Sequence, residues 1–423
     1  MLLKLIITYK LIIMNSPRKM VNMDNMMEKV ITKPANRLNN VSPSAMRELF
    51  EIAGRLRAQG KRIIDFGLGD IDIPLSTQVR QGIIQAIDDG KTRYGPNSGE
   101  IILRQAIAKK YKEQRKVDLQ EANILVSCGA LESLLDIALA YINSGDEMVF
   151  HEPTFPYFGS QVLLAGGKLN PISLDNSTNF KLTPELLNEH ITDKTKLVAI
   201  NFPTNPTGGY INNNDLRGIV EICQEKGILL VSDEVYEFIT YDGYKAPSVL
   251  DFDYENVIVV NSASKALRMT GIRVGYCLSP VKEIIAPVAQ IHQYNTAHAG
   301  VPNQMGALMG LKHETEIVND TMKIFEERRK ALVEYWSKIP GVKFENPKAT
   351  FYLYPDISGT GMNSSEFSKF ALENGVVVVP GHTFCFNKNV PGGDNFVRLS
   401  YGVGAVSDIK DSAQMLIEGF EKK

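Results

Sequence analysis

The sequence predicts an α/β protein with a large domain, whose mostly parallel, mixed sheet lies between helices, and a smaller α/β domain. Two observations lead to this prediction. Short apolar runs rich in β-branched residues alternate with segments of helical periodicity, which is typical of a parallel sheet covered by helices. The 423 residues are also enough for two hydrophobic cores, and no internal repeat is visible.

The large domain is expected to cover residues 76–304. Its apolar runs predict strands at 124–127, 147–150, 196–201, 228–232, 257–261 and 274–278. Helical periodicity predicts helices at 132–141, 184–190 and 216–226, between these strands. Strand and helix therefore alternate through this part of the chain, which favours a parallel arrangement.

Residues 31–75 and 305–423 are expected to form the smaller domain. A long amphipathic helix is predicted over 314–338. It is followed by predicted strands at 351–354, 376–379 and 396–400 and by a predicted helix at 364–374. The N-terminal segment is expected to complete this domain.

The chain begins with the apolar stretch MLLKLIITYKLIIM, which Lys4 and Lys10 interrupt. It is shorter than the roughly 20 apolar residues that a membrane helix needs, so no membrane partner is predicted. A signal peptide would require a cleavage site of small residues, and none follows. Because five methionines occur between positions 14 and 27, we interpret residues 1–30 as a disordered extension or as the product of a misplaced start site.

The composition is that of an ordinary soluble globular protein, with 44% hydrophobic and 22% charged residues. The formal net charge is −2 and no block of lysine or arginine occurs, which argues against nucleic acid as the partner. The four cysteines lie far apart without a CxxC pair, so we expect reduced thiols in a cytoplasmic protein. The six histidines form no HxxxH or HxH pair, so no metal site is predicted.

Polar segments follow three successive predicted strands. NFPTNPTGG (201–209) follows LVAI, SDEVY (232–236) follows ILLV, and NSASK (261–265) follows VIVV. Because neighbouring parallel strands end at the same edge of a sheet, we expect these segments to form one site.

Each segment carries a residue with a specific chemical use. Asp233 follows an apolar strand, where a carboxylate is costly unless a cation such as a protonated ring nitrogen faces it; a helix N-cap is the alternative. Lys265 can form a Schiff base if its neighbours lower its pKa. Asn205 lies in a turn dense in proline and glycine, where an ordinary turn asparagine is equally expected.

A phosphate site is predicted from two further patterns. Ser262, Ser264 and Arg273 offer two hydroxyls and a guanidinium fork, although a structural ion pair is the alternative for Arg273. The stretch VSCGALES (126–133) ends a strand, turns at a glycine and opens a helix, so the N–H groups of Ala130 and Leu131 would face an anion. The ring of Phe155 is a candidate for stacking on a planar cofactor.

Together these are the parts needed to hold pyridoxal 5'-phosphate. The chain resembles the class I aminotransferases of pyridoxal-phosphate fold type I, especially the prokaryotic aspartate and aromatic amino acid aminotransferases. The resemblance runs from about residue 35 to the end. It rests on the motifs NPTG, SDEVY, SASK with GIRVGY, and FVRLSY.

The resemblance implies a role for each matching residue. Lys265 would be the Schiff-base lysine and proton shuttle, and Asp233 would keep the pyridine nitrogen protonated. Asn205 and Tyr236 would bond the ring oxygen, and Phe155 would stack on the ring. The phosphate would be held by Ser262, Ser264, Arg273, the Ala130 and Leu131 amides, and Tyr94 of the neighbouring subunit, so a homodimer is implied. Arg398 would bind the substrate α-carboxylate, assisted by Asn205 and the backbone near Gly67.

Two positions depart from the family pattern. Where the family has Gly-x-Pro-Asp, this chain has GLGD (67–70), with a glycine in place of the proline. The segment 290–300 carries no arginine for a side-chain carboxylate, and Leu131 stands where some prokaryotic aspartate enzymes have lysine. Tyr294, Asn295 and His298 could equally shape a pocket for aromatic or broader substrates.

The implied activity is a ping-pong transfer of the amino group from an L-amino acid (aspartate, aromatic or broad specificity) to a 2-oxo acid such as 2-oxoglutarate. A carbon–sulfur β-lyase is the alternative, because it uses the same cofactor site. A non-catalytic regulator is a third interpretation, which the presence of Lys265, Asp233 and Arg398 disfavours.

Overall fold

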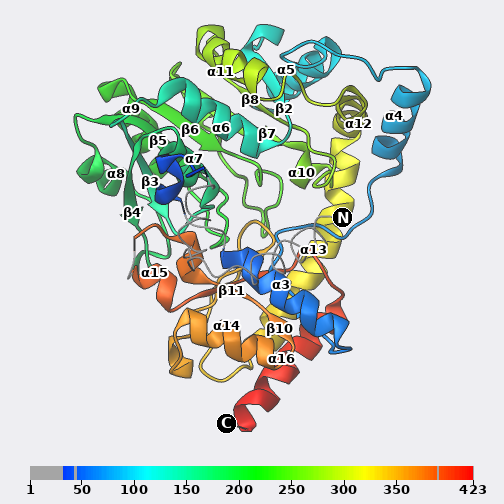
Figure 1. The fold of residues 1–423 in the computed structure, drawn as a ribbon, viewed down its shortest axis with the longest axis vertical. Helices are drawn as coiled ribbons and strands as arrows, with labels where there is room; N and C mark the ends of the chain where they lie inside the picture. Colours follow the sequence, from blue (N-terminus) through cyan, green and yellow to red (C-terminus); the bar gives the residue numbers. More distant parts are fainter. Residues whose placement is uncertain (1–31, 42–44, 388–389, 423) are drawn as a thin grey trace, which may run out of the picture. The chain divides into compact units, whose positions relative to one another are not determined.

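The computed structural model describes residues 32–41, 45–387 and 390–422, and the chain divides into two units, 1–40 and 41–423. The described part of the first unit, 32–40, holds a short 3₁₀ helix, η1 (Asn36–Asn40). The expectation for residues 1–30 lies outside the described residues. All elements discussed below belong to the second unit (Figure 1).

A seven-stranded sheet forms the centre of the second unit, with the strand order β2-β8-β7-β6-β5-β3-β4. Its strands are β2 (Ile124–Ser127), β3 (Glu147–Glu152), β4 (Lys168–Ser173), β5 (Thr195–Asn201), β6 (Leu229–Asp233), β7 (Val257–Ser262) and β8 (Gly275–Leu278). The strands from β7 to β4 are parallel neighbours, whereas β8 is antiparallel to both β7 and β2. The expected mostly parallel, mixed sheet is confirmed.

The six strands expected in this sheet are all present, with ends that differ by at most two residues. β4 was missed, because it is an edge strand with one buried residue, Ile172, and a mostly polar sequence, KLNPIS. An edge strand of this kind lacks the apolar run that identifies the central strands.

Helices cover both faces of this sheet (Figure 1). Consecutive strand residues, such as Leu197 and Val198, point to opposite faces of the sheet and belong to different hydrophobic clusters, as the two-residue period of a strand requires. One cluster includes residues of α4 (Thr77–Asp88), α5 (Ile101–Arg115), α8 (Pro184–His190), α9 (Asn213–Lys226) and α12 (Val301–Lys312). The other includes residues of α6 (Ala130–Tyr141), α7 (Tyr157–Leu164) and α11 (Lys282–Asn295). The short helix α10 (Ala263–Ala266) follows β7 directly.

A third hydrophobic cluster gathers around two small sheets and includes the buried Phe66, Trp336 and Leu399. β1 (Ile64–Asp65) pairs in parallel with β10 (Val376–Val377), and β12 (Val397–Ser400) lies antiparallel between β11 (Val379–Pro380) and β9 (Tyr352–Leu353). The remaining helices are α3 (Ala45–Ala58), α13 (Glu314–Trp336), α14 (Ser364–Glu373), α15 (Pro391–Asp394) and α16 (Val406–Glu421). The elements predicted after residue 314 are therefore present, with the 376–379 run divided into β10 and β11.

None of the helices in the described part of the chain is long and apolar enough to cross a bilayer.

Candidate active site

A cavity of about 880 Å³ lies where β5, β6 and β7 end. All of the predicted site residues except Tyr94 line it, namely Gly67, Ala130, Leu131, Phe155, Asn205, Asp233, Tyr236, Ser262, Ser264, Lys265, Arg273 and Arg398. The strand register explains why the three polar segments meet. Asn201 of β5 pairs with Asp233 of β6, which pairs in turn with Val260 of β7.

Hydrogen bonds from Asn201 fold the turn after β5 and hold Asn205 at the cavity. Its carbonyl oxygen accepts from the Thr204 hydroxyl at 2.7 Å, and its side-chain Oδ1 accepts from the Asn205 N–H at 3.1 Å. The amide Nδ2 of Asn201 donates to the carbonyl oxygen of Asp233 at 3.2 Å, which ties this turn to the end of β6. Asn205 is thus more than an ordinary turn asparagine, because its side chain is buried beside Arg398.

Asp233 is 9% exposed, and its carboxylate accepts a hydrogen bond from the Val235 N–H at 3.3 Å. Burial raises the pKa of Asp233 to about 7, against the opposing effects of this N–H group and of Lys265. The alternative that Asp233 caps a helix is wrong, because residues 235–238, which follow it, form a turn and no helix begins there. The site therefore offers a buried carboxylate that a ligand cation would stabilise.

Lys265 lies in α10, and its Nζ donates a hydrogen bond to the carbonyl oxygen of Gly69 at 2.7 Å. Burial lowers the pKa of Lys265 to about 8; Arg398 lowers it further, whereas the nearby Asp70 opposes the shift. A lysine with a lowered pKa has a larger neutral fraction near pH 7, which is the form that acts as nucleophile and base.

Several hydrogen-bond donors surround one end of the cavity. The Ser262 hydroxyl donates to the Ser264 hydroxyl at 2.8 Å, and Arg273 donates to the Thr270 carbonyl at 2.8 Å. Among the described residues, no carboxylate lies within 4 Å of the Arg273 guanidinium, so the alternative of a structural ion pair is not met. Helix α6 begins at Ala130 beside them. This is the donor set of a phosphate site.

Gly129 is required at this end of the cavity for two reasons. Its φ of +98° is in the region that favours glycine. A Cβ atom on Gly129 would also lie 2.5 Å from Nη2 of Arg273, so a side chain there would displace the guanidinium.

Arg398 of β12 is 3% exposed, so the alternative of a surface arginine is wrong. Its Nη1 donates to Asn205 Oδ1 at 3.1 Å and its Nη2 donates to the Gly67 carbonyl. The Nε is buried without a hydrogen-bond partner, and no carboxylate within the described ranges lies within 4 Å of the guanidinium. A buried arginine without a carboxylate is costly, and a ligand carboxylate would satisfy it.

Residues 61–412 match the family described as aminotransferase class I and II. The chain belongs to the class I and II aminotransferases. The family expected from the motifs is thereby confirmed, and with it the cofactor, pyridoxal 5'-phosphate, and the transfer of an amino group from an amino acid to a 2-oxo acid.

Individual relatives agree with this assignment. A "Probable aspartate/prephenate aminotransferase" of Aquifex aeolicus is 34% identical over 397 residues, which are 92% of this aminotransferase and 97% of that protein. A "Probable aspartate aminotransferase" of Methanocaldococcus jannaschii is 35% identical over 392 residues, covering 92% and 100% of the two chains. The solved aspartate aminotransferase from Thermus thermophilus with maleate has a TM-score of 0.86 at 28% identity, covering 92% and 100%. None of these relatives favours the carbon–sulfur lyase.

The cavity of the aminotransferase fits pyridoxal phosphate. The buried Asp233 lacks a full cationic partner, which a protonated pyridine nitrogen would supply. Arg273 and the start of α6 offer unpaired donors for the phosphate, and Gly129 leaves the space that they need. When bound, this cofactor withdraws electrons from the substrate carbon, which makes the α-proton acidic.

Sequence reasoning missed several residues that line the cavity of the aminotransferase, among them Asp70, Tyr157 and Tyr352. Tyr352 of β9 forms a hydrogen bond of 2.8 Å between its hydroxyl and that of Tyr236. Asp70 lies in the GLGD stretch that the motifs had marked. No sequence motif marks Tyr352 as a site residue, because it reaches the site only through the packing of β9.

The departure at Gly69 has a structural reason. A Cβ atom on Gly69, which proline would carry, would overlap the Tyr352 hydroxyl. The glycine therefore makes room for the Tyr352–Tyr236 hydrogen bond.

The pattern search for metal sites also missed a cluster on the two helices α6 and α11. Ligand atoms of Glu132, Asp136 and His292 lie within 4.8 Å of one another. Nδ1 of His292 is hydrogen-bonded to Asp136 Oδ2 at 3.2 Å, whereas Nε2 of the same ring is buried without a hydrogen-bond partner. Spacing rules cannot find such a trio, because its members come from elements far apart in sequence.

Tyr94 does not line the cavity of its own chain. Its side chain is 93% exposed, and its ring packs edge-on against His298 at a centroid distance of 5.7 Å. Tyr294 is 82% exposed, and neither it nor Asn295 or His298 lines this cavity.

Proposed function

We propose that the cavity is the active site of this aminotransferase and that it acts on aromatic or a broad range of L-amino acids, with a 2-oxo acid such as 2-oxoglutarate as acceptor. The observation that carries the proposal is the placement of Lys265, with its lowered pKa, in one cavity with the buried Asp233 and Arg398.

Each residue has a proposed role toward the cofactor. Lys265 holds it covalently, and Asp233 keeps its ring nitrogen protonated. Asn205 and Tyr236 bond its ring oxygen, and Phe155 stacks on the ring. Its phosphate is bound by Ser262, Ser264, Arg273 and the backbone amides of Ala130 and Leu131. The placement of the side chains around one cavity and the chemistry of each donor support these proposed roles.

The proposed reaction uses Lys265 as base and acid. Arg398 binds the substrate α-carboxylate as a fork, with Asn205 and the Gly67 carbonyl fixing the guanidinium plane. When the substrate amine takes the place of Lys265 on the cofactor, Lys265 is released as a free amine, which would take the α-proton of the held substrate and give it back as the ammonium form. Its lowered pKa supplies a neutral fraction near pH 7 without making the amine a poor base.

The lining of the cavity supports the proposed substrates. Its cations are Lys265, Arg273 and Arg398, which all have roles already, and no further lysine or arginine of the described chain lines it. Leu131, Phe155 and Tyr157 offer apolar surface instead. Among the relatives, names include both aspartate and aromatic amino acid aminotransferases.

The test is the absorbance spectrum of the purified protein, titrated separately with phenylalanine, tyrosine, aspartate, glutamate, alanine and cysteine. Phenylalanine or tyrosine should convert the visible cofactor band to the shorter-wavelength amine form, and 2-oxoglutarate should restore it. Conversion by aspartate alone would contradict the aromatic or broad specificity. Release of pyruvate and sulfide from cysteine, faster than any band conversion, would favour the lyase.

We also propose a homodimer in which Tyr94 reaches the phosphate of the neighbouring site. The support is the exposure of Tyr94, together with the exposed Ile84, Ile87 and Ile101 on α4 and α5. Large apolar side chains that face solvent are typical of an interface. Light scattering should give twice the chain mass, and a monomer would contradict the proposal.

The division into a large domain, 76–304, and a small domain, 31–75 with 305–423, is likewise proposed. The support is the cluster around Trp336, which collects residues from both ends of the chain, such as Phe66 and Leu399. A cytoplasmic location is proposed from the four cysteines, which are all free thiols.

A further inference from the structure

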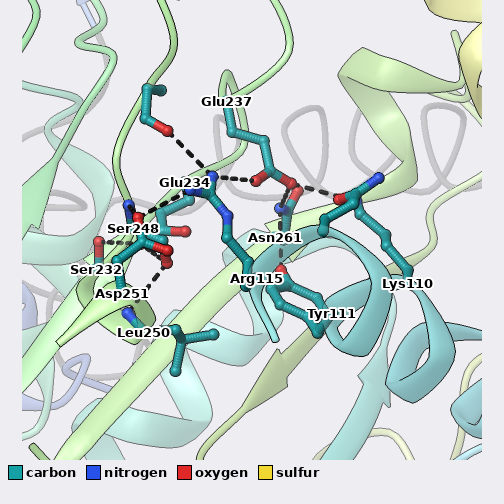
Figure 2. A network of polar contacts seen from close by, with 12 residues as sticks. Lys110, Tyr111, Arg115, Ser232, Glu234, Glu237, Ser248, Leu250, Asp251 and Asn261 are labelled. Atoms are coloured by element: carbon teal, nitrogen blue, oxygen red, sulfur yellow. Dashed lines mark hydrogen bonds and ion pairs between the residues drawn. The ribbon is translucent and has the colours of Figure 1, made fainter. Parts of the chain in front are cut away.

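A network of largely buried charged and polar side chains connects α5 with the turn after β6 (Figure 2). Nζ of Lys110, on α5, is 3.2 Å from Glu237 Oε1 and 3.1 Å from Glu314 Oε1. Arg115, one turn further along α5, is 3.3 Å from Glu237 Oε2 and 2.9 Å from Asp251 Oδ2. Glu237 therefore bridges these two cations of the helix, and Lys110, Glu237 and Glu314 are all buried.

The turn after β6 presents one set of side chains to the cavity and another to this network. Asp233 and Tyr236 line the cavity. Glu234, between them, accepts hydrogen bonds from the hydroxyls of Ser232 and Ser248 at 2.9 and 3.0 Å, and Glu237 faces α5. Tyr236 itself is held by a separate hydrogen bond, 2.8 Å long, between its hydroxyl and that of Tyr352.

A chain of hydrogen bonds connects Glu237 to the proposed phosphate site. Nδ2 of Asn261 donates to Glu237 Oε1 at 2.7 Å, and Asn261 Oδ1 accepts from the Ser262 N–H at 2.7 Å. The Ser262 hydroxyl then donates to that of Ser264 at 2.8 Å. The amide of Asn261 is thus fixed at both ends, so its orientation sets that of the Ser262 backbone.

Stability alone does not account for this arrangement. Buried charges lose their hydration, and apolar residues of similar volume would often stabilise a fold as well. What a hydrogen-bonded charge network supplies is a fixed geometry, since each member has partners in particular directions. The hydrogen bonds of this network lead to the segment that carries the Ser262–Ser264 pair.

We propose that Glu237 is a positioning residue of the active site, which acts through Asn261 on the hydroxyls that bind the cofactor phosphate. This inference rests on the proposed function of the cavity. It predicts a selective defect in phosphate recognition, because the chain of hydrogen bonds from Glu237 leads to the hydroxyls that are proposed to bind the phosphate.

The variant Glu237→Met removes the acceptor and keeps much of the side-chain volume, and Glu314→Met is the matched control. Both remove one carboxylate partner of Lys110, but Asn261 donates its hydrogen bond to Glu237 and not to Glu314. The measurement is the dissociation constant of each cofactor-free variant for pyridoxal phosphate and for pyridoxal, which lacks the phosphate.

Glu237→Met should weaken the binding of pyridoxal phosphate at least tenfold and that of pyridoxal less than twofold, whereas Glu314→Met should change neither more than twofold. Charge alone predicts the opposite, because loss of a nearby carboxylate favours an anion. An equal loss for both ligands, or equal behaviour of the two variants, would overturn the inference.

A second variant keeps the inference testable if Glu237→Met does not fold. Asn261→Leu breaks the chain of hydrogen bonds without removing a charge and should show the same selective loss. Unchanged binding in Asn261→Leu would overturn the positioning role. A wild-type protein that binds neither ligand would instead overturn the proposed function on which the inference rests.

Discussion

The amine of Lys265 donates a hydrogen bond to the carbonyl oxygen of Gly69, with 2.7 Å between Nζ and O. The same loop supplies the Gly67 carbonyl that Arg398 contacts. Both side chains of the proposed catalytic step are therefore hydrogen-bonded to one short stretch, 67–70, and Arg398, the proposed carboxylate site, contacts the loop that also holds Lys265.

Replacement of Lys265 by alanine should abolish transamination, with a loss on the order of 10⁴-fold or more, because the proposed base and covalent anchor are both removed. The far-ultraviolet circular dichroism should be unchanged. Lys112→Ala, on the exposed surface of α5, is the control and should keep full activity. Comparable turnover in the two variants would exclude the proposed role of Lys265.

Replacement of Asp233 by asparagine should stabilise the cofactor-free protein at pH 8 while it abolishes activity. Burial raises the folded-state pKa of Asp233 to about 7, above the unfolded value of about 3.9, so the folded state binds the proton more tightly. This contribution to stability is full below about pH 4 and is lost as the pH rises to about 7. The gain from the variant should therefore reach about 2–4 kcal/mol at pH 8 and vanish near pH 4, as thermal unfolding at several pH values would show. A gain that is independent of pH would contradict this account.

Replacement of Arg398 by lysine keeps the charge but removes the planar fork that matches a carboxylate. We expect kcat/KM for the amino acid to fall about 10- to 100-fold, as charge-assisted hydrogen bonds are lost. The affinity for pyridoxal phosphate should stay the same, since Arg398 is proposed to bind the substrate alone. An equal loss of cofactor affinity would show that Arg398 acts on the cofactor site.

Replacement of Gly69 by alanine should destabilise the protein by about 1–3 kcal/mol, because the new Cβ overlaps the Tyr352 hydroxyl. The double variant Gly69→Ala with Tyr352→Phe should recover part of this loss. Gly54→Ala is the matched control, since a Cβ there meets no atom within 4 Å. Chemical denaturation gives the three free energies, and a Gly69→Ala protein as stable as the Gly54→Ala protein would refute the overlap.

The sequence predicted the parts of the site that lie close to strand ends. Asp233, Asn205 and the Ser262–Lys265 segment could be found because each follows an apolar run, and parallel neighbours bring such ends together. Tyr352 and Glu237 could not be placed in this way. Tyr352 reaches the cavity through the packing of β9, and Glu237 is proposed to act on the site through Asn261.

Strand β8 runs antiparallel to its two neighbours in the sheet, and this direction determines which residue lies at the site. Because β8 runs against β7, Gly275 at its start lies opposite Ser262 at the end of β7. Arg273 comes shortly before β8, so it lies at the edge of the sheet where the other strands end. Had β8 run in the common direction, its entrance would lie at the far edge, about 13 Å away for a strand of four residues. The segment before β8 therefore lies beside the segments that follow the parallel strands, and this places the guanidinium of Arg273 at the site.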